Sequence, residues 1–181
     1  MNLEEKTISS QTIFKGRIIT VKKDSVVLPD GSEAGREFIE HPGGVCVVPL
    51  TEKNEVLMVR QYRYPYKEVV LEIPAGKKDP GEDPFTTGKR ELKEETGATA
   101  KTYIDLGELY PSPGYCGEII WMYGAKDLDF GENNPDQDEF LEVERVPLVR
   151  AVEMIISGEI KDAKTQAAIL KINYLVNNGK F

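Results

Sequence analysis

The sequence predicts an α/β (α+β) fold in which short strands form a mixed sheet and helices pack against it. Apolar, β-rich runs at residues 43–50 and 55–63 can supply buried strands, and a turn signal separates them. Strands and helices follow one another without the regular βαβ alternation that builds a doubly wound sheet. The length of 181 residues suits one domain with a small additional subdomain.

The chain is expected to divide near residues 40–43, where the composition changes before the first strongly buried strand. Ahead of this point, residues 1–42 form an N-terminal β-segment with short strands over 11–40. Behind it, residues 43–181 form the main domain. The strands of the main domain are expected at 43–50, 55–63, 68–76, 100–110, 117–128 and 140–148.

Three helices are expected in the main domain, and the first has clear signals at both ends. Asp83 suits the N-cap and Pro84 the first helical position, and Gly97 stands where a left-handed glycine ends a helix. Gly88 lies inside this helix at a cost of about 1 kcal/mol relative to alanine, and no sequence feature explains it. The other two helices are expected at 149–160 and 162–176.

The composition excludes several classes of protein. The formal net charge of −8 argues against non-specific binding to nucleic acid or to anionic membranes, so neither partner is expected. The N-terminus lacks the apolar segment of a signal peptide, and no apolar run approaches the about 18 residues of a transmembrane helix. With two cysteines, Cys46 and Cys116, a reducing compartment is favoured, and we expect a cytoplasmic protein.

Carboxylates are the main candidates for chemistry, because other familiar catalytic groups are missing. His41 is the single histidine, which leaves no multi-histidine zinc site and no obvious Ser-His-Asp triad. Glu91, Glu94 and Glu95 fall on one face of the first helix, where like charges repel one another. Oxygen-only clusters select hard cations such as Mg²⁺ or Mn²⁺, which bind phosphates. The alternative interpretation is an ordinary solvated helix face.

A longer pattern favours the chemical interpretation. Residues 76–98, “GKKDPGEDPFTTGKRELKEETGA”, resemble the motif G-x5-E-x7-R-E-U-x-E-E-x-G-U of the Nudix hydrolases, with Ala98 as a small occupant of the last apolar slot. The fixed positions are filled by Gly76, Glu82, Arg90, Glu91, Glu94, Glu95 and Gly97. The resemblance implies a Nudix-type α/β/α sandwich with a mixed sheet. It also implies an enzyme that cleaves a nucleoside diphosphate linked to another group.

The resemblance assigns roles within this motif, which we call the box. The implied metal ligands are the main-chain carbonyl of Ala75 and the carboxylates of Glu91 and Glu95. Glu94 would assist them, and Arg90 could orient Glu82 or Glu91 through a bidentate hydrogen bond. The expected cofactor is Mg²⁺, with Mn²⁺ as an alternative.

Outside the box, the chain resembles the ADP-ribose pyrophosphatases over nearly its whole length. The segments that carry this resemblance are “REFIEHPGG”, “RQYRYP” (60–65), “LEIPAG” (71–76), Pro113 and “DAKTQAAIL”. They imply Mg²⁺-dependent hydrolysis of ADP-ribose to AMP and ribose 5-phosphate. Two alternatives stay open. One is a pyrophosphatase for another nucleotide sugar, such as GDP-mannose, and the other is a non-catalytic Nudix domain that senses ADP-ribose.

This second resemblance implies further site residues and a partner. The candidates for substrate binding are Arg36, Arg63, Pro113, Gly114 and, for stacking on adenine, Phe14 or another residue of its segment. The general base is expected in the acid-rich loop 136–143, with Glu139 first and Asp138, Asp136 and Glu142 as alternatives. The N-terminal sheet is implied to exchange between two subunits. We therefore expect a homodimer in which Arg36 serves the site of the other subunit.

Overall fold

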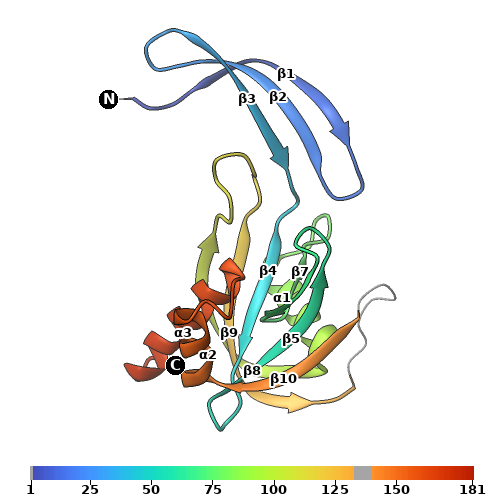
Figure 1. The fold of residues 1–181 in the computed structure, drawn as a ribbon, viewed down its shortest axis with the longest axis vertical. Coiled ribbons are helices and arrows are strands. Elements are labelled where there is room, and N and C mark those ends of the chain that lie inside the picture. The colour runs from blue at the N-terminus through green and yellow to red at the C-terminus, as the bar shows by residue number, and fades with distance from the viewer. Residues whose placement is uncertain (1, 133–139) are drawn as a thin grey trace. The chain divides into compact units, whose positions relative to one another are not determined.

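The computed structural model describes residues 2–132 and 140–181, and the chain divides into two compact units (Figure 1). The smaller unit joins the N-terminal residues through Gly43 to Tyr110–Ile119. The larger unit comprises Gly44–Leu109 and Ile120–Phe181. In the part of the chain that the structure describes, no helix is long and apolar enough to cross a membrane.

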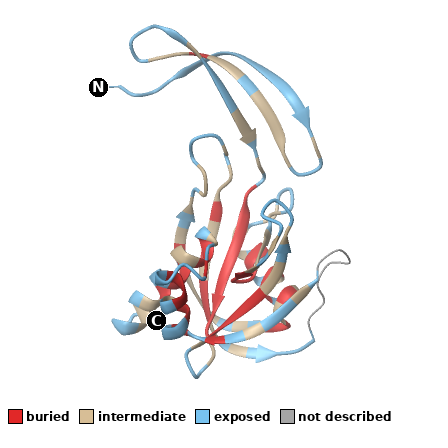
Figure 2. Cartoon of the chain, in the orientation of Figure 1, coloured by how far each residue is buried: buried red, intermediate tan, exposed pale blue. Residues whose placement is uncertain are grey.

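The smaller unit contains an antiparallel sheet in the order β1-β2-β3. Its strands are β1 (Lys6–Lys15), β2 (Thr20–Val27) and β3 (Glu33–Glu40). The turn between β2 and β3 places Gly31 at a φ of 87°, a conformation that glycine adopts without steric cost. Every residue of β1 is exposed (Figure 2), so pairing with β2 defines this strand more than an apolar pattern does. This explains why β1 begins at Lys6, ahead of the expected strands over 11–40.

The larger unit contains two sheets and the helices. Its elements are β4 (Gly44–Pro49), β5 (Glu55–Arg63), β6 (Glu68–Glu72), β7 (Ala75–Lys77), α1 (Pro84–Thr96), β8 (Ala98–Leu109), β9 (Ile120–Phe130), β10 (Leu141–Pro147), α2 (Leu148–Ile156) and α3 (Ala163–Asn177). One sheet has the order β7-β4-β9-β8, in which β4 and β9 run parallel and the other neighbours run antiparallel. The other sheet is antiparallel, in the order β10-β5-β6.

Strand β4 shows that the mixed sheet is covered on both faces. Cys46 and Val48 belong to a core cluster with Ile169 of α3. Val47, between them, belongs to a second cluster with Leu92 of α1. Because successive residues of a strand point to opposite faces, α1 lies on one face of the sheet and α2 with α3 on the other (Figures 1 and 2). The structure confirms the expected α/β/α sandwich with a mixed sheet.

Gly88, which has no explanation in the sequence, allows α1 to approach β4 closely. A Cβ atom at this position would lie 3.1 Å from Cγ1 of Val45 and 3.3 Å from Cγ2 of Val47, both tighter than ordinary van der Waals contact. The glycine is therefore a packing requirement of the helix–sheet contact. That contact sets the distance between α1 and the sheet, and with it the position of the box glutamates.

The single strand expected over 68–76 is wrong. β6 pairs with β5 in one sheet and ends at Glu72, whereas β7 pairs with β4 in the other sheet and begins at Ala75. Pro74 lies between them and has no N–H with which to continue a ladder. The chain therefore passes from one sheet to the other at this point, next to the candidate site.

The helix expected to reach residue 160 ends earlier, at Ile156. Gly158 follows it with a φ of 79°, and the Gly158 N–H donates to the Ile155 carbonyl at 3.1 Å. A glycine in this left-handed conformation is a common way to end a helix, so the turn stops α2 before the next segment. The last helix begins at Ala163, with Asp162 as its N-cap.

Candidate active site on helix α1 and strand β7

Helix α1 carries most of the candidate site, and local contacts fix both of its ends. Asp83 is the N-cap, and its Oδ2 accepts a hydrogen bond from the Thr86 N–H at 3.0 Å. Gly97 ends the helix with a φ of 70°, and its N–H donates to the Lys93 carbonyl at 2.8 Å. The bounds Pro84–Thr96 confirm the helix expected from these signals. Because the two caps fix where the helix begins and ends, they also fix the directions in which Glu91, Glu94 and Glu95 point.

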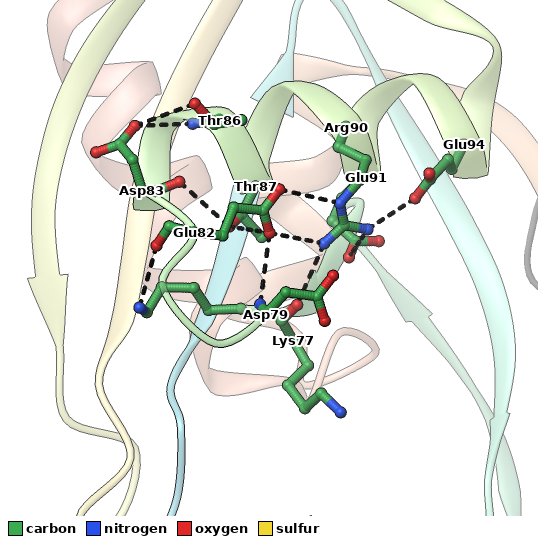
Figure 3. Close-up of polar contacts among 10 residues, drawn as sticks. Lys77, Asp79, Glu82, Asp83, Thr86, Thr87, Arg90, Glu91 and Glu94 are labelled. Atoms are coloured by element: carbon green, nitrogen blue, oxygen red, sulfur yellow. Dashed lines mark hydrogen bonds and ion pairs between the residues drawn. The ribbon is translucent and has the colours of Figure 1, made fainter.

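Arg90 lies at the centre of the box carboxylates (Figure 3). Its Nε donates to Glu82 Oε1 at 3.2 Å and its Nη2 to Glu82 Oε2 at 3.1 Å, which is a bidentate pair. Its Nη1 donates to Glu91 Oε1 at 2.7 Å and to Glu94 Oε2 at 2.8 Å. One cation thus holds three carboxylates together. The cluster still carries an excess of negative charge, which favours a bound cation.

Glu82 lies in the loop before α1 and is held by three kinds of donor. In addition to Arg90, the Thr87 hydroxyl donates to Glu82 Oε2 at 2.8 Å, and the Asp79 N–H donates to the same oxygen at 3.4 Å. The hydrogen bonds from Arg90 above all, with help from Thr87 and Asp79, lower the pKa of Glu82 to about 2. Glu82 therefore stays ionised at neutral pH and anchors the Arg90 guanidinium.

The carboxylates of Glu91 and Glu95 both lie against the backbone of β7. The Ala75 N–H donates to Glu95 Oε2 at 3.2 Å. A Cβ atom at Gly76 would lie only 1.9 Å from Cδ of Glu91, so the absence of a side chain at Gly76 makes room for that carboxylate. Glu91 is 8% exposed and Glu95 is 1% exposed. Two buried carboxylates and the Ala75–Gly76 main chain thus meet at one edge of the sheet.

This donor set fits a small hard cation. Carboxylate and carbonyl oxygens are the ligands that Mg²⁺ and Mn²⁺ prefer. In residues 2–132 and 140–181, no three His, Cys, Asp or Glu side chains form a complete metal site by themselves. The residues able to hold such an ion are Ala75, Glu91 and Glu95.

A second charged cluster, which the sequence analysis missed, lies around Glu72. This carboxylate is 2% exposed, and Arg63 bonds it through Nε at 2.6 Å and Nη2 at 2.7 Å. Lys164 of α3 bonds the same carboxylate, and its Nζ lies 3.0 Å from Asp162 Oδ2. Burial alone would raise the pKa of Glu72, but the Arg63 hydrogen bond and the Lys164 charge outweigh it and lower this pKa.

One sequence signal could have revealed this cluster. Glu72 ends a strand, “EVVLE”, whose neighbouring residues Val69, Val70 and Leu71 are apolar. A carboxylate at the inner end of an apolar strand requires a paired cation, because a buried unpaired charge is too costly. The sequence does not say which cation serves, since Lys164 lies 92 positions away.

Replacing Glu72 by glutamine should destabilise the fold by about 3–5 kcal/mol at neutral pH, because Lys164 and Arg63 lose their shared anion. The folded-state pKa of Glu72 lies below its ordinary value of 4.5, so the ionised carboxylate stabilises the fold above that pH. This contribution is lost as the pH falls through the folded-state pKa. The difference in unfolding free energy between the two proteins should therefore shrink below pH 4.5. Urea unfolding across this pH range measures it.

A matched control for this prediction is Glu144→Gln. Glu144 accepts a similar fork from Arg60, at 2.9 and 3.2 Å, but the pair is about one-third exposed. Removal of its charge should cost only about 0–1 kcal/mol. Equal losses in the two variants, or a Glu72 effect that stays constant into acid, would contradict the account of a buried paired carboxylate.

Four of the expected substrate-binding residues lie in the smaller unit, whereas the box and Arg63 lie in the larger one. Phe14 is exposed on β1, and Pro113 and Gly114 lie in a turn. Arg36 on β3 donates from Nε to Glu5 Oε2 at 2.8 Å, and this hydrogen bond raises the pKa of Arg36. The structure thus brings together the box residues with Ala75. It pairs the guanidinium of Arg63 with the carboxylate of Glu72.

The expected general base falls in a part of the chain that is not described. Glu139, together with its alternatives Asp136 and Asp138, lies outside the described residues. Glu142, the remaining alternative, lies opposite Arg60 in the backbone ladder between β10 and β5. Strand β10 (Leu141–Pro147) pairs regularly with β5, which confirms the strand expected over 140–148 and places Glu142 within it.

Comparison with profiles of known protein families shows to which family the chain belongs. A profile described as the NUDIX domain matches residues 40–168. The chain belongs to the Nudix family. A second profile, described as the nucleoside diphosphate sugar hydrolase N-terminal domain, matches residues 5–39 of this Nudix protein. Together the two matches span both the N-terminal sheet and the sandwich that carries the box.

Several curated Nudix relatives match over most of the chain. An ADP-ribose pyrophosphatase from Bacillus subtilis is 43% identical over 170 residues, covering 93% of this chain and 92% of the relative. A methanol dehydrogenase activator from Bacillus methanolicus is 43% identical over 168 residues, covering 92% and 91%. A GDP-mannose pyrophosphatase from Escherichia coli is more distant, with 33% identity over 150 residues, covering 77% and 76%.

A solved structure confirms the fold of this Nudix protein. The crystal structure of an ADP compounds hydrolase matches with a TM-score of 0.87 and covers 100% of both chains. Its sequence identity of 24% is low, so the likeness concerns the fold. The solved structure thus supports the fold of the N-terminal sheet and of the mixed sheet with its helices, each taken by itself.

Proposed function

We propose that this Nudix protein hydrolyses ADP-ribose to AMP and ribose 5-phosphate with a divalent cation, Mg²⁺ first and Mn²⁺ as the alternative. The observation that carries the proposal is the meeting of Glu91 and Glu95 at the Ala75–Gly76 backbone, within a box that fills every fixed position of the family motif. The similarity to the B. subtilis ADP-ribose pyrophosphatase over 93% of this chain supports ADP-ribose as the substrate.

The residues of the site have distinct parts in this proposal. The Ala75 carbonyl and the carboxylates of Glu91 and Glu95 would hold a divalent cation, which would neutralise charge on the pyrophosphate oxygens and activate water. Arg90 keeps the box carboxylates in place through the four hydrogen bonds described above. Arg63 binds phosphate or ribose oxygens of the substrate through N–H groups that lie outside its fork on Glu72.

We place the general base at Glu139, in the acid-rich segment ahead of β10. The box carboxylates Glu82, Glu91 and Glu94 are already engaged in ion pairs with Arg90. Replacing Glu139 by glutamine should lower kcat by at least about 10²-fold with little change in KM, because a base acts in the transition state. Steady-state kinetics measures both constants.

Two further variants locate the base if Glu139 is the wrong choice. Near-normal turnover in Glu139→Gln, together with a large loss of turnover in Asp138→Asn or Glu142→Gln, would assign the general base to Asp138 or Glu142. Near-normal turnover in all three would contradict a base at Glu139, Asp138 or Glu142, and Glu94 or Glu82 would become the candidate.

A panel of nucleotide sugars tests the substrate. We expect kcat/KM for ADP-ribose to exceed that for ADP-glucose and GDP-mannose by at least about tenfold, because contacts to the sugar and base decide such ratios. The lower similarity of the chain to the GDP-mannose pyrophosphatases favours this order. A preference for GDP-mannose would support the first alternative and contradict the proposal. Binding of ADP-ribose without turnover would support the sensor.

We also propose that the protein is a homodimer in which the N-terminal sheet of residues 1–42 packs on a second copy of the chain. β1 is an edge strand of this sheet and exposes Ile8, Ile13 and Phe14 by 52%, 54% and 56%. An unpaired edge with large exposed apolar side chains is the kind of surface that associates with another chain. In such a dimer, Arg36 would serve the site of the other subunit.

Light scattering should give a mass near twice 20.3 kDa. The double substitution Ile8→Glu and Ile13→Glu should yield a monomer with reduced activity, since it puts charges into the apolar contact. Thr12→Glu, on the same exposed strand, is the control for added charge alone. A wild-type monomer with full activity would contradict the proposed assembly.

We propose a cytoplasmic location on chemical grounds. Both cysteines are free, and burial raises the pKa of the Cys46 thiol to about 12, so this thiol stays protonated. Free thiols persist most readily in a reducing compartment. The net charge of −8 disfavours nucleic acid as a partner. Fractionation of cells tests the location, and recovery of the protein outside the cytoplasm would contradict it.

A further inference from the structure

Among the substrate-binding candidates, Arg63 lies in the larger unit, which also contains the box. Its side chain is held by hydrogen bonds to Glu72. The fork from Nε and Nη2 onto Glu72 fixes the plane of the guanidinium. It leaves the remaining N–H groups of the guanidinium outside the fork. Any change in the orientation of the Glu72 carboxylate would therefore rotate the face that Arg63 offers to a ligand.

The Glu72 carboxylate is in turn oriented by the first turn of α3. Lys164 bonds Glu72 Oε2, the oxygen that also accepts from Arg63 Nη2. Lys164 is itself held by Asp162, the N-cap of α3, whose Oδ2 accepts from the Thr165 N–H at 3.0 Å. The chain of contacts thus runs from a rigid helix N-terminus through Lys164 and Glu72 to Arg63.

A second contact ties the same helix turn to the strand. The Thr165 hydroxyl accepts a hydrogen bond from the Ile73 N–H at 3.0 Å, directly after Glu72. Thr165 is fully buried and Lys164 is 9% exposed, so these two residues of the helix turn are closely packed. Two acids and two bases meet here, Glu72 and Asp162 with Arg63 and Lys164. The cluster is therefore neutral as a unit, and Arg63 alone would already neutralise Glu72.

Arg63 lies near the box, because its partner Glu72 ends β6 and Ala75 begins β7 only three residues later. The negative charge of Glu95 is close enough to contribute to a raised pKa of Arg63, after the larger effect of the Glu72 hydrogen bond. A flexible arginine at this place would be drawn toward the acidic box and would compete with a cation for its carboxylates. The second anchor through Lys164 opposes that movement, because it holds Glu72, and with it Arg63, from the side of α3.

We propose that Glu72, Lys164 and Asp162 are positioning residues that hold the Arg63 guanidinium in the orientation in which it binds the substrate. This inference rests on the proposed function, in which Arg63 contacts phosphate or ribose oxygens. None of the three needs to touch the substrate. Their effect on catalysis should pass entirely through Arg63, and this separates a positioning role from a purely structural one.

A double-mutant cycle on the full chain tests the proposal. Lys164→Met should raise KM for the best substrate of the nucleotide-sugar panel about fivefold or more, with kcat changed less than about twofold. Arg63→Ala should raise KM further. In the Arg63→Ala background, Lys164→Met should change KM by less than about twofold, because the group on which it acts is gone.

Two more variants keep the test sharp. Asp162→Asn removes the charge that orients Lys164 and retains helix capping, since asparagine caps a helix as well as aspartate does, so it serves if Lys164→Met folds poorly. It should show the same loss of effect in the Arg63→Ala background. Glu144→Gln, which releases Arg60 on the same strand β5, should leave KM unchanged in both backgrounds.

The outcomes separate the inference from the function on which it rests. An equal rise of KM in both backgrounds overturns the positioning role, as does an unchanged KM in Lys164→Met and Asp162→Asn. An unchanged KM in Arg63→Ala overturns both that role and the substrate contact of Arg63. Turnover of another panel member in place of ADP-ribose overturns the proposed substrate alone. A wild-type protein that turns over no member of the panel overturns both proposals.

Discussion

Replacing Glu95 by glutamine should lower kcat by at least about 10³-fold, because a metal ligand supplies several kcal/mol of transition-state stabilisation. The side chain keeps its shape and one oxygen, so the hydrogen bond from the Ala75 N–H at 3.2 Å can still form. The fold should therefore persist. The change removes a negative charge that serves the cation, and the Mg²⁺ concentration for half-maximal rate should rise.

The measurement is kcat against Mg²⁺ concentration for wild type and variant, with urea unfolding to confirm that both proteins are folded. Glu153→Gln is a suitable control, since Glu153 is an exposed helical glutamate on α2 that pairs with Arg150 at 3.5 Å. It should leave the rate unchanged. Near-normal Mg²⁺-dependent turnover in Glu95→Gln would refute the assignment of Glu95 as a metal ligand.

Replacing Gly76 by alanine should reduce kcat to a similar extent, by at least about 10³-fold, although alanine carries no charge. The added Cβ would lie 1.9 Å from Cδ and 2.0 Å from Oε1 of Glu91, which no side chain tolerates. The Glu91 side chain can move aside, because the clash is with the far end of a flexible residue. The expected result is therefore a folded protein whose Glu91 carboxylate has left the Ala75–Gly76 backbone.

Kinetics and urea unfolding together separate this effect from a loss of stability. Gly131→Ala is the matched control, because an added Cβ there would lie 3.7 Å from the Gly97 carbonyl oxygen, an ordinary van der Waals contact. A Gly76→Ala protein with wild-type kcat would show that the carboxylate of Glu91 need not occupy that space. A protein that fails to fold would contradict the expectation that Glu91 yields at low cost.

The part of the site that local sequence rules describe was predictable. Helix α1 follows from Asp83, Pro84 and Gly97, each of which acts on its own neighbours within one turn. The box has fixed spacing within a short stretch, and helical periodicity alone puts its glutamates on one face of the helix. The buried strands followed from apolar runs such as Gly44–Pro49, every residue of which is buried. The α/β/α arrangement followed from the resemblance that the box carries.

The remainder depends on contacts between distant residues, which local patterns do not encode. The Lys164–Glu72 bond joins positions 92 residues apart, and nothing near either residue indicates the other. Gly88 is explained only by the packing of β4 against it. The apolar run around Pro74 predicts one strand, whereas the pairing of its two halves with different sheets decides where it divides. The position of the Glu91 carboxylate next to Gly76 likewise depends on the packing of α1 against β7.

The most direct test of the central claim is product analysis of ADP-ribose incubated with the purified protein, with Mg²⁺ and then with excess chelator. The account predicts equal amounts of AMP and ribose 5-phosphate with Mg²⁺, no products with chelator, and restoration of activity when Mg²⁺ is returned in excess. Unchanged ADP-ribose in the presence of Mg²⁺ or Mn²⁺, or cleavage that persists without any divalent cation, would contradict it.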